Sequence, residues 1–169
     1  VVPTPTLRNI MSQLEPFIQP ESLIINASKG IENDSLSTCH KIIKDSLNIP
    51  CDVASISGPT FAKEVAAKVP SALLACSESE NTTKRVQKIF SSKYIKVFTS
   101  TDVVGVEIGG ALKNVIAIAT GISDGLKLGF NTRAALITRG LVEITRIGTE
   151  LGAKPETFYG LSGLGDLVL

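Results

Sequence analysis

Short apolar runs alternate with segments of helical periodicity along residues 1–100. The runs favour strands and are bounded by turn-forming residues, which predicts strands at residues 23–25, 53–57, 72–76 and 94–98. A helix is expected at residues 61–69. Helical spacing predicts three more amphipathic helices, each with an apolar stripe that faces inward. The stripes are Leu7, Ile10, Met11 and Leu14 in the first, Leu36, Cys39 and Ile43 in the second, and Val86, Ile89 and Phe90 in the third. This alternation is typical of a layered α/β sheet.

Residues 103–120 are nearly all apolar or small and contain no proline, which predicts a single helix. Thr101 or Asp102 can accept hydrogen bonds from its first turn, and Gly121 offers an end. Because no face is polar, we expect the helix to be buried on most sides.

Strand signals stop after Thr101, and a second long helix follows with a cap at Asn131 or Thr132. Its apolar stripe is expected at Ile137, Leu141, Ile144 and Leu151. We therefore expect two domains that meet near Ser100, an α/β domain over residues 1–100 and a helical domain over residues 101–169.

Lys113 interrupts the apolar helix and shares a stripe with Gly109, Gly110 and Ala117. Small side chains leave room for another backbone or a ligand to approach. A lysine there loses water, which disfavours its charged form and suits it to donate and accept a proton. The spacing alone equally allows a lysine that reaches the surface or pairs with a carboxylate for structure.

The segment GVEIGGALKNVIAIATGISDGL, residues 105–126, resembles the start of the helical domain in soluble NAD(P)-dependent glycerol-3-phosphate dehydrogenases. Three further motifs agree in order with the bacterial-type members of that family: ASKG at 27–30, SGPTFAKE at 57–64 and GLGDL at 163–167. The resemblance covers essentially the whole chain. It implies a Rossmann-like sheet domain, truncated at its N-terminus, followed by an all-α domain, truncated at its C-terminus.

In this family the lysine of the ALKN motif is the general acid/base, which assigns catalysis and substrate contact to Lys113. The resemblance also implies that Asn114 and Asp166 contact the substrate and orient Lys113. Without the resemblance, the segment around Asp166 is an ordinary glycine-rich turn, since its G-x-x-G-x-G order fails the dinucleotide-binding pattern.

Lys29 follows a strand, at the kind of position where ligands gather in parallel sheets, although a lone loop lysine is usually only solvated. The resemblance implies that Lys29 contacts both cofactor and substrate, that Gly58 and Thr60 contact substrate, and that Ala62 contacts cofactor. On the residues alone, the turn before Ala62 is equally a plain helix cap.

The implied reaction is reversible hydride transfer between NAD or NADP and dihydroxyacetone phosphate, which gives sn-glycerol 3-phosphate for glycerophospholipid synthesis. Two alternatives stay open: another lysine-dependent hydroxyacid dehydrogenase of similar architecture, and a non-catalytic relative that acts as an interaction module. A homodimer is possible.

The chain begins on Val1-Val2 without Met and ends on Val168-Leu169 after a Gly-rich turn, so we expect a fragment that folds but is catalytically poor alone. The family's G-x-G-x-x-G loop would lie upstream, and its phosphate-binding Arg-Asn pair downstream.

Composition limits the kinds of ligand and partner that the chain is expected to bind. A net charge of +1 gives no reason to expect nucleic acid, and with one histidine in the chain we expect no metal site. No signal peptide or uninterrupted membrane-length apolar run is apparent. The chain has 3 cysteines, an odd number, which suggests reduced thiols in a cytoplasmic protein.

Overall fold

The computed structural model describes all residues, 1–169. The sheet-bearing part contains α1 (Thr4–Leu14), β1 (Leu23–Asn26), α2 (Cys39–Asp45), β2 (Asp52–Ser57), α3 (Ala62–Ala66), β3 (Ser71–Cys76), α4 (Glu80–Phe90) and β4 (Ile95–Ser100). It is followed by α5 (Val103–Gly125) and α6 (Phe130–Glu150). Short helical turns lie at η1 (Glu15–Phe17), η2 (Pro155–Tyr159) and η3 (Leu161–Gly165), the last a single π-helical turn.

The four strands lie in the order β1-β2-β3-β4. The pairs β1–β2 and β3–β4 are parallel, whereas β2 and β3 are antiparallel. The α/β sheet is therefore mixed, with two parallel pairs and one antiparallel pair. One reason is that residues 58–70 contain only the five-residue helix α3, while a parallel crossover generally needs a longer helix. The carboxyl ends of β1 and β2 thus share one edge, and those of β3 and β4 lie at the other.

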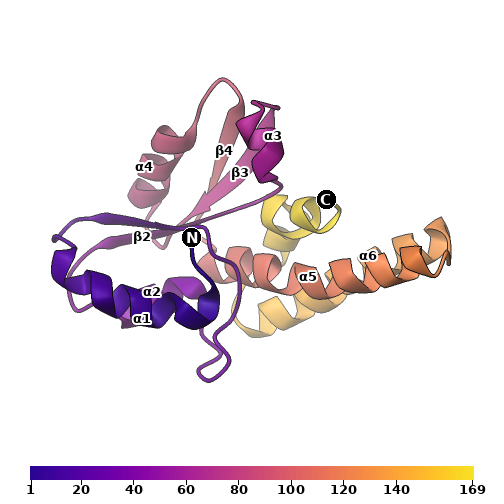
Figure 1. Ribbon diagram of the computed structural model, residues 1–169, viewed down its shortest axis with the longest axis horizontal. Helices are drawn as coiled ribbons and strands as arrows, with labels where there is room; N and C mark the ends of the chain where they lie inside the picture. The colour runs from indigo at the N-terminus through magenta and orange to yellow at the C-terminus, as the bar shows by residue number, and fades with distance from the viewer.

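Helices cover both faces of the sheet. Val53 packs with α1 and α2, while its neighbour Ala54 packs with α4, as strand alternation requires. In Figure 1, α1 and α2 lie together beside β2, and α4 flanks β3 and β4. Three expected core residues are exposed instead: Leu14 is the last residue of α1, Leu36 precedes α2 in a left-handed conformation, and Ile89 lies on the outer side of α4.

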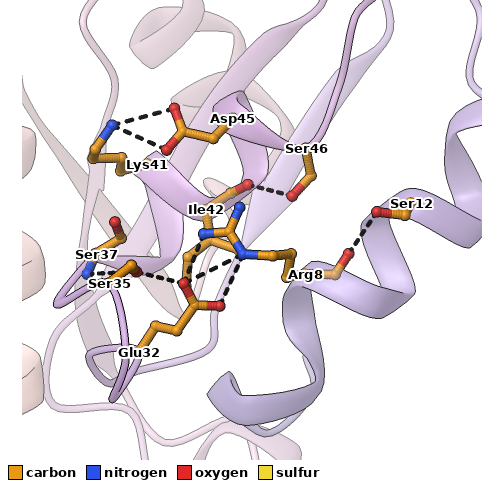
Figure 2. Close-up of polar contacts among 9 residues, drawn as sticks. All are labelled: Arg8, Ser12, Glu32, Ser35, Ser37, Lys41, Ile42, Asp45 and Ser46. Carbon is orange, nitrogen blue, oxygen red and sulfur yellow. Dashed lines mark hydrogen bonds and ion pairs between the residues drawn. The ribbon is translucent and has the colours of Figure 1, made fainter.

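The loop after β1 is fastened to α1 by an ion pair. Arg8 donates to both carboxylate oxygens of Glu32, with its Nη2 2.6 Å from Oε2, and Ser35 donates to Oε2 as well (Figure 2). These hydrogen bonds hold the pKa of Glu32 down at about 2. An antiparallel bridge between Ile31 and Thr38 closes the base of the loop.

Asp102 caps α5 as predicted, because its Oδ1 accepts from the backbone N–H of Gly105 at 2.9 Å. The helix continues past Gly121 to Gly125, so Gly121 is not its end. Its first two turns, residues 103–110, are largely buried. The second half is not buried, since it exposes Val115, Ile118 and Ile122. The prediction that this helix is buried on most sides is therefore wrong for its second half. By length and composition α5 is apolar enough to cross a membrane, and 44% of its most apolar window is buried.

The helix α6 runs back along α5, and the pair projects away from the sheet (Figure 1). It begins at Phe130, after Gly129, so neither Asn131 nor Thr132 is its cap. The two helices pack closely at Gly140, where an added Cβ would lie 2.6 Å from Cγ2 of Ile116. Leu141 and Ile144 are buried as predicted, whereas Leu151 lies beyond the helix and is exposed.

Candidate active site

Three charged side chains from distant parts of the chain meet in one cluster. Lys29 follows β1, Lys113 lies in α5, and Asp166 directly follows η3. The ammonium of Lys29 bonds to Oδ2 of Asp166, and that of Lys113 bonds to Oδ1. The Asp166 side chain is 2% exposed, against 29% for Lys29 and 19% for Lys113. A buried carboxylate thus holds two lysines whose ends remain partly open.

The surroundings of Lys29 favour loss of its proton. Burial lowers its pKa below the ordinary value, and the positive charge of Lys113 acts in the same direction. The carboxylate of Asp166 opposes both effects by hydrogen bonding and by its charge. The protonation of Lys29 is therefore sensitive to each of the other two members of the cluster.

The backbone that carries Lys29 is fixed on several sides. Thr4 Oγ1 donates to the Lys29 carbonyl at 3.0 Å, and Val2 N donates to Ser28 Oγ at 2.9 Å. Asn26 also stabilises this turn, because its Oδ1 accepts a hydrogen bond from Ser28 N at 2.9 Å. The side chain of Lys29 therefore leaves from a rigid loop.

Close backbone packing brings Asp166 to Lys113. At Gly109 of α5, an added Cβ would lie 2.7 Å from the carbonyl oxygen of Ser162 in η3. At Gly163, an added Cβ would lie 2.0 Å from the Phe158 carbonyl. The small residues beside Lys113 thus admit another backbone, which is one of the two uses predicted for them.

A second buried carboxylate, Glu107, lies deeper in the interface between α5 and the sheet. It accepts from the backbone N–H of His40 at 2.9 Å, from Ser55 Oγ at 2.6 Å and from Asn26 Nδ2 at 3.3 Å. Sequence reasoning missed this role, although an acidic residue in an apolar helix was a visible signal. Through Asn26, Glu107 also supports the loop that carries Lys29.

A cavity of about 80 Å³ lies next to Lys29. Its lining is Ala27, Lys29, Ile56, Ser57, Thr60 and Leu73. Thr60 Oγ1 donates to the carbonyl of Gly58 at 3.3 Å, and Gly58 itself turns the chain with φ +130°. The structure thus brings Thr60 beside Lys29, with Gly58 forming the turn between β2 and Thr60.

Two other predicted site residues lie apart from this cluster. Asn114 is exposed, and no hydrogen bond joins its side chain to Lys113 or Asp166. Ala62 is the exposed first residue of α3. No group of three His, Cys, Asp or Glu side chains is arranged to hold a metal ion.

Comparison with known proteins identifies the family. The description "NAD-dependent glycerol-3-phosphate dehydrogenase N-terminus" matches residues 1–83, and the description "NAD-dependent glycerol-3-phosphate dehydrogenase C-terminus" matches residues 102–169. The chain belongs to the NAD-dependent glycerol-3-phosphate dehydrogenase family.

Relatives within the glycerol-3-phosphate dehydrogenase family align along the whole chain. The enzyme named glycerol-3-phosphate dehydrogenase [NAD(P)+] from Syntrophotalea carbinolica is 54% identical over 173 residues, covering 100% of this chain and 51% of the relative. Its counterpart from Leptospira biflexa is 52% identical over 99% of this chain and 51% of its own. The chain thus spans about half the length of the curated relatives it matches.

Solved glycerol-3-phosphate dehydrogenases have the same fold. The crystal structure from Coxiella burnetii superposes with a TM-score of 0.94 at 42% identity, over 99% of this chain and 51% of that one. The Saccharomyces cerevisiae structure gives 0.87 at 31% identity, over 99% and 51%. The predicted fold class, a Rossmann-like sheet followed by helices, is confirmed.

Proposed function

We propose that the protein containing this chain is an NAD(P)-dependent oxidoreductase that acts on a CH–OH group. It reversibly transfers hydride between NAD(P)H and dihydroxyacetone phosphate to give sn-glycerol 3-phosphate, a precursor of glycerophospholipids. The observation that carries this proposal is the joining of Lys29 and Lys113 on the buried carboxylate of Asp166. Family membership supports the substrate, because the aligned relatives are named glycerol-3-phosphate dehydrogenases [NAD(P)+].

The residues that follow the carboxyl ends of β1 and β2 fit a nicotinamide cofactor. An ammonium has three N–H donors, and Asp166 is the acceptor that Lys29 engages, so further donors of Lys29 are free for amide or phosphate oxygens. Ala62 adds an exposed small side chain that permits close approach. When bound, the cofactor supplies or accepts the hydride, and the protein orients the reactants and handles the proton.

Lys113 is the proposed general acid/base. In the direction of reduction it donates a proton to the C2 carbonyl oxygen of the substrate, and in the reverse direction it removes that proton. Its positive charge also stabilises the negative charge that develops on this oxygen. Asp166 holds the ammonium in position from a site that water barely reaches.

The remaining site residues are assigned to binding. Lys29 bridges cofactor and substrate, while Gly58 and Thr60 contact the substrate beside the cavity described above. Asn114 is assigned to a substrate hydroxyl. Its exposed position leaves its amide free for that contact.

We also propose two domains that meet near Ser100, residues 1–100 and 101–169, which agrees with the two matched segments. The apolar helix α5 is proposed as a core helix rather than a membrane span, because its first half is buried against the sheet and its middle bears Lys113. A cytoplasmic location accords with the three free thiols. A homodimer is proposed as the assembly of the whole protein.

The test is an assay of the full-length protein that follows the absorbance of NADH or NADPH. Dihydroxyacetone phosphate should be reduced, whereas 2-keto acids should not. Preferential reduction of a 2-keto acid would instead favour the hydroxyacid dehydrogenase alternative. Cofactor binding without any turnover would favour a non-catalytic relative.

A further inference from the structure

Ser57 has a buried hydroxyl that no group in the protein satisfies. It is the last residue of β2, is 8% exposed, and its Oγ has no hydrogen-bond partner. Ser55, two residues earlier on the same face of the strand, donates to Glu107 at 2.6 Å. A buried hydroxyl normally finds a partner, so the free Oγ of Ser57 requires an explanation.

The Ser57 hydroxyl lies within the proposed active site. An added Cβ at Gly110 would lie 3.3 Å from Ser57 Oγ and 3.5 Å from Cδ of Lys29, so both side chains meet over this glycine. Gly110 comes one helical turn before Lys113. Ser57 also lines the cavity of about 80 Å³ together with Lys29 and Thr60.

The cavity suits a neutral hydroxyl better than a phosphate group. Its volume of about 80 Å³ is several times the roughly 10–15 Å³ that one water needs, so a substrate group of several heavy atoms fits, and its polar lining decides which group. Apart from Lys29, its polar lining consists of the neutral hydroxyls of Ser57 and Thr60, with no second cation to balance the charge of a phosphate. A serine hydroxyl can both donate to and accept from a second hydroxyl.

From these contacts we infer that Ser57 binds the free, non-phosphorylated hydroxyl of the three-carbon substrate and so helps to determine specificity. This inference rests on the proposed function. It adds a residue and a particular substrate group to that site. The free Oγ is then satisfied by the substrate, and a substrate without this hydroxyl would leave it unpaired.

The test compares two substrates in the full-length protein: dihydroxyacetone phosphate, and hydroxyacetone phosphate, which lacks the free hydroxyl. Ser57→Ala should lower kcat/KM for dihydroxyacetone phosphate by about tenfold, the scale of one lost hydrogen bond. It should leave kcat/KM for hydroxyacetone phosphate within about twofold. Ser57→Cys, of similar size but a weak donor, should shift the preference in the same direction.

Ser123→Ala is the matched control, because Ser123 Oγ is also buried and unpartnered, and Ser123 does not line the cavity. This variant should keep the wild-type preference between the two substrates. Equal losses for both substrates in Ser57→Ala, or no loss, would overturn the assignment of Ser57 while leaving the proposed function intact. A wild-type protein that does not reduce dihydroxyacetone phosphate would overturn both.

Discussion

The Lys113 ammonium lies on one carboxylate oxygen of Asp166, 53 residues further along the chain, and the Lys29 ammonium lies on the other. The cluster therefore contains two positive side chains and one negative side chain when all three are ionised. The excess positive charge suits an anionic substrate, and it also suits the charge that develops on a carbonyl oxygen during reduction. A single carboxylate thus orders both lysines.

Replacement of Lys113 tests the general acid/base assignment. Lys113→Met keeps the aliphatic stem and removes the proton, so turnover of the full-length protein should fall by about 10²–10⁴. Cofactor affinity and thermal stability should change much less. Lys113→Arg should recover little activity, because a guanidinium retains its proton and has a different shape.

The matched control for Lys113→Met is Lys96→Met on β4, since Lys96 is exposed and makes no ion pair. Its turnover should equal that of the wild type. Near-normal turnover of Lys113→Met at neutral pH would make Lys113 a structural residue and would remove the proposed proton transfer.

Replacement of Asp166 tests how the two lysines depend on their shared carboxylate. Asp166→Asn removes the charge that opposes desolvation of Lys29, while the charge of Lys113 remains, so the pKa of Lys29 should fall further. Titration of the Lys29 ammonium by NMR with labelled lysine measures this shift. Activity should fall by at least tenfold, because both ammonium groups lose their anchor. An unchanged titration of Lys29 would show that Asp166 does not govern its protonation.

Local sequence signals predicted the local features of the site. Of the two cap candidates, Thr101 and Asp102, the structure uses Asp102. Gly109 indicated the close approach of a backbone or a ligand, and in the structure a backbone approaches it. The pairing of Lys113 with Asp166 did not follow from spacing, because the two residues are 53 positions apart. It was expected only from the resemblance of two separate motifs to one family.

Some features could not be predicted because a sequence pattern does not show how an element packs against the rest of the fold. The composition of α5 shows that the helix is mostly apolar, but it does not show which other elements pack against it. The exposure of Ile118 was therefore not predicted. Periodicity predicts a strand without its direction, so it gave no prediction of the antiparallel pairing of β2 and β3. The hydroxyl of Ser57 looked ordinary because its lack of a partner is a property of the packed structure.

Replacement of Glu107 tests the buried network behind the lysines. Glu107→Gln replaces a carboxylate that accepts from His40 N, Ser55 Oγ and Asn26 Nδ2 with an amide that accepts at one end only. The free energy of unfolding should fall by about 2–3 kcal/mol, measured by urea denaturation. Glu64→Gln, at an exposed position of α3, should change it by no more than about 0.5 kcal/mol. Equal stabilities of the two variants would contradict the structural role of Glu107.

The ion pair between Arg8 and Glu32 predicts a dependence of stability on acid pH. The pKa of Glu32 is about 2 in the folded protein, because Arg8 and then Ser35 hydrogen-bond to its carboxylate, against an ordinary value of 4.5. A carboxylate with a lowered pKa stabilises the folded state above its unfolded pKa, and this contribution is lost as the pH falls. The stability difference between the wild type and Glu32→Gln should therefore be constant above about pH 5.5 and shrink from about pH 4.5 toward pH 2. Urea denaturation at successive pH values measures this difference. Arg8→Met should show the same narrowing, and adding Glu32→Gln to it should cost little more, because the pair is already broken. A difference that stays constant down to pH 3 would show that Glu32 is not held as a carboxylate by Arg8.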